Sequence, residues 1–587
     1  MRRESASNEA LHHRALIKES EKNRMHKRRA SRTASSKRLF LLALLLTVGA
    51  TPIAEGQSRV KARATASPLP AAAMRAAEQI TAAQLSEYLH FIASDEMEGR
   101  DTPSRGLDTT AKFIALQLAR AGVKPAGENG TYFQRIALRR VRVDPAQTRV
   151  TLNGQEFRYG EDFLAGNFSG QASGNLVYVG HGWVFPAKNI NAYAGVDVRD
   201  KIMIVTGGLP KGVTFRDVAE GRSGQDWESP DSYGRKNGAR GIVIIPNFQA
   251  LATWNRRQQS AVERGITFVE SFQSTEANQL PTITASLSLL NALFRGEKLS
   301  AADLFARAIS GEAGEAFALS PDKTLTVSVK AASETIYTQN VIGMVEGSDP
   351  VLKNEYVALG AHYDHVGVGL PDDKGDRIYN GADDDGSGTT ALLAMAEAAA
   401  RSSVRPKRSL LFVWHAGEEK GLWGSRYFTE HPTVPLGQII AQLNVDMIGR
   451  SKRDGDAKPE NHDLSGPNEI YIIGSRMMST ELGDLSERVN GAYLNLALNY
   501  KYDDPKDPNR FFFRSDHYNY AQKGIPIIFY FNGVHEDYHR PSDSPDKIDY
   551  QKMERVARTI FMTAWALADL PQRPRVDKQL PAELRAR

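Results

Sequence analysis

The sequence contains no cysteine. A chain without cysteine has no disulfide bonds, no thiolate zinc site and no iron–sulfur cluster, and it cannot be a cysteine protease. We therefore expect its stability to come from hydrophobic cores. A length of 587 residues exceeds what one core usually supports, so two or more domains are expected. The composition, 41% hydrophobic and 24% charged, is typical of a soluble globular protein.

Beyond its first residues the chain has no excess of positive charge. Residues 1–38 hold twelve Lys and Arg against four Glu, whereas the remainder carries a net charge of −3 within a total of +5. A basic patch is the electrostatic signature of nucleic-acid binding, and here the basicity is confined to the N-terminal leader. We therefore predict no nucleic-acid partner.

The leader continues into a run of about a dozen apolar and small residues at 39–50. A basic stretch followed by such a run is typical of a secretory signal, and the run is short for a membrane span. We predict a signal peptide over 1–56, with Met25 as a possible alternative start, and a linker over 57–75. The protein is then expected in a bacterial periplasm or outside the cell, without stable membrane insertion after cleavage; an uncleaved anchor is the alternative.

The remaining chain changes character twice. Apolar residues at helical spacing predict two helices between residues 80 and 122, on either side of a turn at 98–101. Residues 150–320 contain short β-rich runs separated by Gly and Asn turns. After residue 320 strands and helices alternate, which predicts a mostly parallel sheet covered by helices.

Five segments rich in Asp, Glu and His follow apolar runs between residues 360 and 540. They lie at 360–364, 381–388, 415–419, 444–447 and 537–540. Carboxylates and imidazoles are suitable ligands for Zn²⁺ and similar ions. Because α/β folds keep their sites where strands end, the five segments together predict a metal-dependent hydrolase.

The residues alone assign some of these side chains and leave others open. His362 follows a predicted strand, and Asp364 is placed to hydrogen-bond its second ring nitrogen. In the triplet 383–385 one carboxylate could bridge two ions, or the triplet could cap the following helix; the sequence does not choose. Glu418 and Glu419 can divide their work, one binding metal and one serving as general base. Asp446 ends an apolar strand and needs a cationic partner.

The last segment spells a His-Glu-x-x-His motif at His535 and His539. This motif binds zinc in metalloproteases only when both histidines lie on one helix. A β-rich run and an Asn-Gly turn precede it, and Pro541 follows, so we reject that interpretation.

Taken in order, His-x-Asp, Gly-Ala-Asp-Asp-Asp-Gly-Ser-Gly, Gly-Glu-Glu, Asp-Met and Tyr-His resemble the M28 family of cocatalytic dizinc peptidases. The resemblance runs from about residue 80 to 570. It implies an α/β fold, an α/β/α sandwich around a mixed, mostly parallel sheet, and two Zn²⁺ ions per chain. It also implies the following roles: His362 and Asp446 on one zinc, Glu419 and His539 on the other, Asp384 bridging both through a strained peptide bond to Asp385, Glu418 as general base, Asp364 as the partner of His362, and Tyr538 as support for the oxyanion.

The function expected from this resemblance is hydrolysis of N-terminal peptide bonds by a secreted zinc aminopeptidase, through a metal-activated bridging water and a glutamate base. A carboxypeptidase or dipeptidase on the same scaffold is the alternative, for which Arg510, Arg514 and the loop at 450–453 could bind a carboxylate. A glutaminyl-cyclase-like enzyme with a single zinc and a receptor-like inactive protein are weaker alternatives.

The middle segment at 233–245 is similar to the Gly-Ala-x-Gly-apolar signature of protease-associated (PA) domains. We therefore predict the following organisation: the N-terminal part of the peptidase domain at 76–155, a PA insert at 156–320, the dizinc peptidase domain at 321–572 and a C-terminal tail at 573–587.

Overall fold

A computed structural model describes residues 69–585, except 167, 215–216, 219–220, 273–278 and 311–313. The predicted signal peptide lies outside the described residues. Within these ranges, no helix combines the length and the apolar character that a membrane crossing requires.

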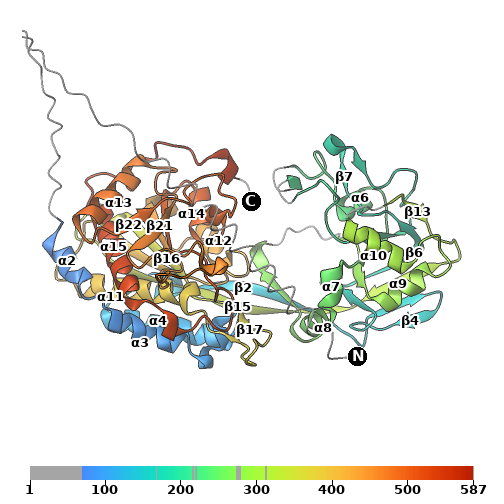
Figure 1. Ribbon diagram of the computed structural model, residues 1–587, viewed down its shortest axis with the longest axis horizontal. Coiled ribbons are helices and arrows are strands. Elements are labelled where there is room, and N and C mark those ends of the chain that lie inside the picture. Colours follow the sequence, from blue (N-terminus) through green and yellow to red (C-terminus); the bar gives the residue numbers. More distant parts are fainter. Residues whose placement is uncertain are drawn as a thin grey trace, which may run out of the picture. The chain divides into compact units, whose positions relative to one another are not determined.

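The larger of two main sheets is mixed (Figure 1). Strands β19, β16, β20 and β23 run parallel to one another at its centre, and antiparallel neighbours flank them. The order across the sheet is β11 (Ile266–Val269), β2 (Phe133–Val143), β15 (Ala331–Val345), β19 (Ser409–His415), β16 (Tyr356–His362), β20 (Ile439–Val445), β23 (Ile527–Phe531), β21 (Glu469–Ile473) and β22 (Ala497–Asn499), with β1 (Lys124–Pro125) paired to β15.

Helices cover both faces of this sheet because its central strands are apolar on both sides. In β19, Phe412 and Trp414 face one layer of helices and Leu411 and Val413 face the other. The first layer consists of α2 (Ala71–Ala77), α3 (Ala82–Ile92), α4 (Arg105–Ala121), α11 (Gly388–Arg401), α13 (Thr480–Ala492) and α15 (Tyr550–Ala568). The second contains α12 (Trp423–Glu430) and α14 (His517–Gln522). The architecture is the predicted α/β/α sandwich.

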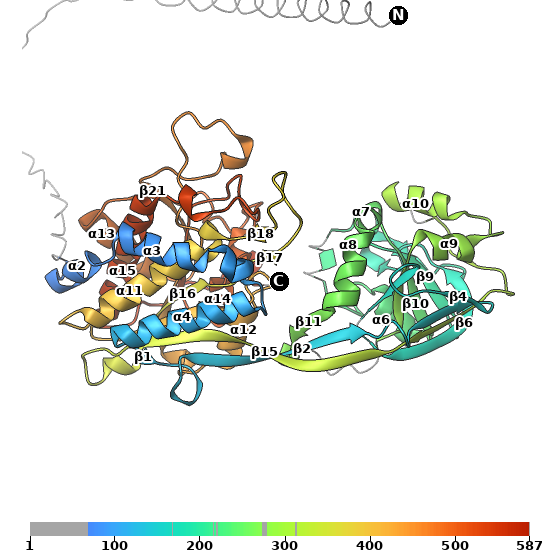
Figure 2. The ribbon, with the colours of Figure 1, turned by 90° about the horizontal axis from the view of Figure 1, so that it is seen from below.

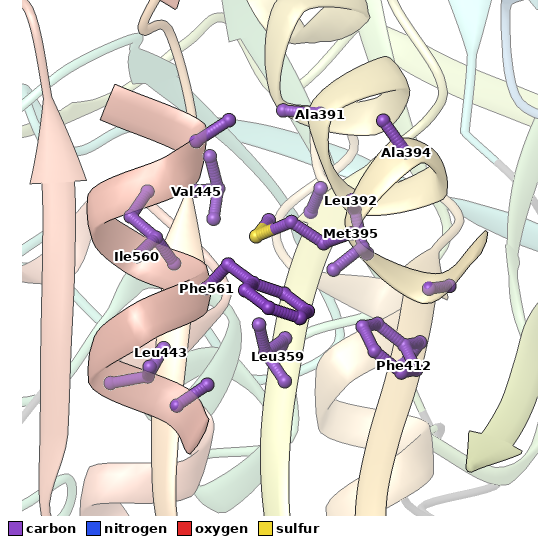
Figure 3. Close-up of a cluster of buried hydrophobic side chains, with 14 of the residues drawn as sticks. Leu359, Ala391, Leu392, Ala394, Met395, Phe412, Leu443, Val445, Ile560 and Phe561 are labelled. Atoms are coloured by element: carbon purple, nitrogen blue, oxygen red, sulfur yellow. The ribbon is translucent and has the colours of Figure 1, made fainter. Parts of the chain in front are cut away.

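The core on the first face is closely filled. Figure 3 shows the side chains of α11 and α15 against those of the central strands, with Met395 and Phe561 meeting Leu359, Phe412 and Leu443. All five are 1% exposed or less. Removing a large side chain from such a core typically costs about 2–5 kcal/mol of stability. This layer therefore holds the strand ends rigidly in register.

A second, β-rich unit follows β2 in the sequence and returns to the first sheet through β15. β2 and β15 pair with each other along their length (Figure 2). The order of the second sheet is β4 (Gln155–Phe157), β3 (Arg149–Leu152), β14 (Thr324–Val329), β6 (Gly170–Tyr178), β9 (Ile202–Thr206), β10 (Gly241–Ile245), β12 (Thr282–Ala285) and β5 (Phe163–Ala165), with β13 (Phe317–Ala318) paired to β6. This sheet, formed between residues 149 and 329, has its own hydrophobic core.

Parts of the predicted linker and of the predicted C-terminal tail pack against the cores. The segment predicted as a linker ends inside α2, where Ala73 and Ala76 are buried in the main core. In the predicted tail, Leu580 and Leu584 are buried against the second layer. In both segments the burial of a few apolar side chains fixes the chain against a core although most neighbouring residues are polar.

Asp503 provides a test of stability that is independent of the site. Its carboxylate accepts a hydrogen bond from the backbone N–H of Gly474. Burial, opposed by this bond and by Arg476, raises the pKa of Asp503 to about 6. A carboxyl group whose pKa is raised on folding stabilises the fold at low pH, and this contribution is lost as pH rises from about 4 through 6.

We therefore expect Asp503→Asn to stabilise the protein at pH 8, by up to about 3 kcal/mol, and to have little effect near pH 4. Thermal unfolding at both pH values measures the difference, and the exposed Asp454→Asn is the control. An equal effect at the two pH values would contradict the assigned pKa.

Candidate metal centre

The carboxyl ends of four parallel strands place most of the site. β16 ends at His362, Glu418 and Glu419 follow β19, and Asp446 follows β20. His539 lies in the loop after β23. Because these strands are parallel, their ends meet at one edge of the sheet. The predicted convergence of the scattered segments is present.

The first group of ligand-type atoms consists of His362, Asp384 and Asp446. His362 Nε2 lies 3.4 Å from Asp384 Oδ1 and 3.5 Å from Asp446 Oδ1. The three residues are 7% exposed or less. Two carboxylates and an imidazole within 4.8 Å of one another can hold a divalent ion.

The second group consists of His365, Asp384, Glu419 and His539. His539 Nε2 lies 3.0 Å from Asp384 Oδ2 and 3.1 Å from Glu419 Oε1, and His365 Nδ1 lies 3.0 Å from the same Glu419 oxygen. Asp384, Glu419 and His539 are predicted for this group from the sequence, whereas His365 is not. The only sequence signal for His365 is its position three residues after His362. His365 lies beyond the end of the strand, where the alternation of a strand no longer predicts the direction in which a side chain points.

Asp384 belongs to both groups. Its Oδ1 faces His362 and its Oδ2 faces His539, so it stands where one carboxylate can bridge two ions. Although burial opposes ionisation, contacts with these two imidazoles hold the pKa of Asp384 well below its usual value. The peptide bond between Asp384 and Asp385 is cis.

The other two members of the triplet support the loops. Asp385 accepts backbone N–H groups of His362, Gly388 and Met447 at 2.9–3.1 Å. Asp383 accepts the N–H of Gly449 at 2.7 Å. Both are fully buried. The two interpretations that the sequence left open therefore concern different members of the triplet: Asp384 stands where a bridging carboxylate would lie, and Asp385 accepts the N–H of Gly388 at the start of α11.

Asp364 differs from its predicted role. Its carboxylate Oδ1 is 3.7 Å from His362 Nδ1, too long for a hydrogen bond, and its backbone carbonyl oxygen lies at 3.2 Å instead. The carboxylate accepts the backbone N–H of Glu418 at 3.1 Å. The strand end turns so that the main chain of Asp364, and not its side chain, reaches the imidazole. Asp364 therefore positions Glu418 as well as His362.

Glu418 and Tyr538 line the same pocket as His362, Asp384 and Asp446. Burial, with the nearby charges of Glu419 and Asp516, raises the pKa of Glu418 well above its usual value, against the lowering effect of His362. Glu418 is in neither group of metal-ligand atoms, so its carboxylate is available to exchange a proton.

Tyr538 stacks on His539, with ring centroids 4.0 Å apart, and its hydroxyl oxygen accepts a hydrogen bond from Arg514 at 3.2 Å. Burial and the charge of Asp384 raise the pKa of Tyr538 above its ordinary value. The hydroxyl therefore keeps its proton and can act as a donor.

The segment with the His-Glu-x-x-His spelling is not a helix. Residues 532–544 form turns and irregular structure. His535 Nε2 lies 3.1 Å from Asp383, whereas His539 faces the second group. The two histidines have different partners, which confirms the rejection of the helical zinc motif.

A buried arginine ties together the loops that carry the two groups. Arg100 donates hydrogen bonds of 2.7–3.0 Å to the carbonyl oxygens of Ile92, Tyr363, Asn380 and Gly381. Tyr363 adjoins His362, and Gly381 begins the loop of the Asp triplet. Arg100 is 0% exposed, so water cannot replace its guanidinium as the donor to these four carbonyl oxygens.

The turn before Arg100 requires glycine at one position. The φ angle of Gly99 is +64°, in the left-handed region. A Cβ there would lie 2.5 Å from the carbonyl oxygen of Tyr379 and 2.6 Å from that of Gly367. Any side chain would push apart the two strands β17 (Gly367–Val368) and β18 (Ile378–Tyr379) beside the site.

The second group passes a test for metal binding. His365 Nδ1, Asp384 Oδ2, Glu419 Oε1 and His539 Nε2 are all buried and have no hydrogen-bond partner among residues 69–585 as described. Buried polar atoms without partners are costly, and four that converge on one point are best satisfied by a shared cation. The residues present therefore fit a bound divalent metal ion.

Comparison with known proteins identifies the domain that carries this site. Residues 340–564 match the model of Peptidase family M28, and this segment contains every residue of both groups. Over these residues the chain therefore contains a segment that matches peptidase family M28.

Two relatives and one solved structure illustrate the similarity. A probable zinc metalloprotease of Pyrenophora teres f. teres is 27% identical over 298 residues, 44% of this chain and 59% of that protein. A probable leucine aminopeptidase 2 of Aspergillus oryzae is 32% identical over 212 residues, 35% of this chain and 36% of that protein. The aminopeptidase from Aneurinibacillus sp. strain AM-1 has a TM-score of 0.48 at 18% identity, covering 86% of this chain and 97% of that chain. The chain thus spans less than two thirds of the two sequence relatives.

Proposed function

We propose that this protein is a zinc-dependent aminopeptidase that binds two zinc ions per chain and removes residues from the N-terminus of peptides. One observation carries the proposal: two buried groups of ligand atoms share Asp384, and a glutamate outside both groups, Glu418, lines the same pocket. The names of relatives, a zinc metalloprotease and a leucine aminopeptidase, agree with it.

In this proposal His362 and Asp446 would hold one ion, Glu419 and His539 would hold the other, and Asp384 would serve both. Imidazole and carboxylate ligands without thiolates suit zinc. When bound, a pair of zinc ions polarises the scissile carbonyl group and makes a nearby water more acidic.

Glu418 accepts the proton of the attacking water and transfers it to the leaving amine. Burial raises the pKa of Glu418 above its usual value, which is the direction that makes a carboxylate a stronger base. Asp364 holds the backbone of Glu418 in place. Tyr538 donates a hydrogen bond from its hydroxyl group to the oxygen on which negative charge develops.

The pocket walls favour an apolar substrate side chain. Beside the carboxylates, the pocket is lined by Met447, Phe511, Phe529, Phe531 and Val534. Phe511 thus contributes to the pocket, whereas Phe512 and Phe513 are buried in the core. Apolar walls with a few placed polar groups are typical of small-molecule and peptide-end sites.

A carboxypeptidase is the second candidate because Arg514 lines the pocket. Its guanidinium could bind a substrate carboxylate. Arg450, considered for the same purpose, is 8% exposed and donates to Asp537 at 2.9 Å, so it is already paired. Arg510 lies over the ring of Phe513 and is absent from the pocket lining.

The two candidates predict different substrates and different effects of Arg514→Ala. An aminopeptidase should hydrolyse anilides of apolar amino acids and leave N-acylated dipeptides intact. Arg514→Ala should then change kcat/KM for anilides by less than about tenfold. Cleavage of N-acylated dipeptides, lost in Arg514→Ala, would favour the carboxypeptidase and overturn the first proposal.

The weaker alternatives have distinct metal and activity signatures. A glutaminyl-cyclase-like enzyme would bind one zinc, and two groups of ligand atoms speak for two ions. A receptor-like inactive protein would lack a ligand or the base, whereas all of these residues are present. Metal analysis and the anilide assay separate these cases.

We also propose that the protein is exported and that its β-rich unit is a protease-associated insert. Export rests on the basic and apolar leader at 1–56. The insert rests on the Gly-Ala-x-Gly segment, in which Ala239 is buried immediately before β10. Mapping the N-terminus of the mature protein tests the first point, since retention of residues 1–56 would contradict cleavage.

A further inference from the structure

We propose that His365 is a fourth protein ligand of the ion held by Asp384, Glu419 and His539, so that the two metal positions are unequal. The His362 group supplies three protein ligands and leaves a coordination position open. The His365 group is closed by four side chains. This inference deepens the proposed function and rests on it.

The distances in the second group match those within a tetrahedral site. A zinc ion about 2.0–2.1 Å from each of four ligands places neighbouring ligand atoms roughly 3.3 Å apart. His365 Nδ1 is 3.0 Å from Glu419 Oε1 and 3.7 Å from Asp384 Oδ2. His539 Nε2 is 3.1 Å from Glu419 Oε1 and 3.0 Å from Asp384 Oδ2. His365 thus occupies the place of a fourth ligand.

A hydrogen bond to Glu419 does not explain His365. Despite their separation of 3.0 Å, neither His365 Nδ1 nor Glu419 Oε1 has a hydrogen-bond partner in the described structure. The second ring nitrogen, Nε2, is also buried without a partner there. An imidazole that is 0% exposed and unpaired on both sides is costly unless it binds something.

The chain around His365 holds the ring in this orientation. Its backbone N–H donates to the carbonyl oxygen of Arg100 at 3.1 Å. A Cβ on Gly381 would lie 2.5 Å from Cγ and 2.6 Å from Cδ2 of the imidazole, so that edge of the ring packs against glycine. The packed edge is the one without nitrogen, and Nδ1 is left facing Glu419. The φ angle of Gly381 is +57°, which also favours glycine.

Because the two ions would have different numbers of protein ligands, we expect them to be released to a chelator at different rates. Sites with four protein ligands resemble structural zinc sites, whereas catalytic sites keep a position free. The ion of the His365 group should be removed by a chelator more slowly. An oxygen of substrate or water should bind at the His362 group.

The test compares three variants of the full chain: His365→Phe, which keeps a ring of similar shape; His365→Asn, which can replace Nδ1 as a hydrogen-bond donor; and the control His517→Phe. His517 is another fully buried histidine, stacked on Phe529 at 4.5 Å and outside both groups. Zinc content is measured by elemental analysis after dialysis against increasing concentrations of a chelator.

We expect the wild type and His517→Phe to keep one ion tightly. In both His365 variants the affinity for that ion should fall by about 100-fold or more, beyond the 10–100-fold typical of losing an outer hydrogen-bond partner. Wild-type zinc retention in His365→Phe would overturn the proposal. Wild-type retention in His365→Asn, with loss in His365→Phe, would overturn it too, because a hydrogen bond would then suffice.

X-ray absorption of the wild-type zinc protein gives a second reading that does not depend on a variant folding. Three imidazoles shared between two ions support His365 as a ligand, and two imidazoles exclude it. This outcome is separate from the proposed function: a wild type with two zinc ions and anilide hydrolysis but only two imidazoles would refute this inference alone. A wild type that binds zinc through three imidazoles but hydrolyses no anilide would refute only the proposed function.

Discussion

Replacing Glu418 with alanine should reduce kcat for an aminoacyl anilide by about 10²–10⁴-fold or more, while two equivalents of zinc remain bound. General base catalysis by one positioned side chain contributes about this much. The metal is retained because the Glu418 carboxylate belongs to neither group of ligand atoms. Steady-state kinetics and elemental analysis of the same preparation measure both quantities.

The neighbouring residue is the matched control for Glu418. Glu419→Ala removes an oxygen that lies 3.1 Å from His539 and should lower the affinity for one ion. Glu418→Gln keeps the shape of the side chain and removes its ability to take a proton, so it should be as inactive as Glu418→Ala. Near-normal turnover in either Glu418 variant would show that another group acts as the base.

Replacing Arg100 with methionine should destabilise the protein by at least about 4 kcal/mol. Each buried acceptor that loses its donor costs about 1–3 kcal/mol, and Arg100 serves four carbonyl oxygens. Native proteins are stable by only about 5–15 kcal/mol, so this loss could leave the variant unfolded at 37 °C.

Chemical denaturation of the Arg100 variant measures the change in free energy of unfolding. Arg105→Met, an exposed arginine at the start of α4, is the control and should change stability by less than about 0.5 kcal/mol. Zinc affinity should fall with Arg100→Met as well, because the freed loops carry His362 and Asp384. Unchanged stability would mean that water or a shifted loop replaces the guanidinium.

The sequence predicted the scaffold of the site well because long apolar runs identify buried strands. The apolar strand expected before Asp446 is β20, and the alternation of strands and helices expected after residue 320 continues to α15. His362, Glu419 and Asp446 sit at or just beyond such strands, so strand position alone brought them to one edge.

The unpredicted features depend on how loops fold back. His365 reaches the second group only because the chain turns after β16 and packs against Gly381. The separate tasks of Asp383, Asp384 and Asp385 follow from backbone directions in a short irregular segment. Adjacent residues of one type carry no pattern from which such directions could be read. The carboxylate of Asp364 was assigned to the wrong partner for the same reason.

The positions of the ligands along the chain also affect when the site can form during synthesis. Its two ends, His362 and His539, are contributed by β16 and the loop after β23. At about 5–20 residues per second, a ribosome needs roughly 10–35 s to synthesise this stretch. A nascent chain that stops before residue 539 lacks a ligand of the second group, and the sheet then lacks its complete edge. A partly made chain therefore cannot assemble the complete metal centre, because the last of its ligands follows β23, one of the last strands of the domain.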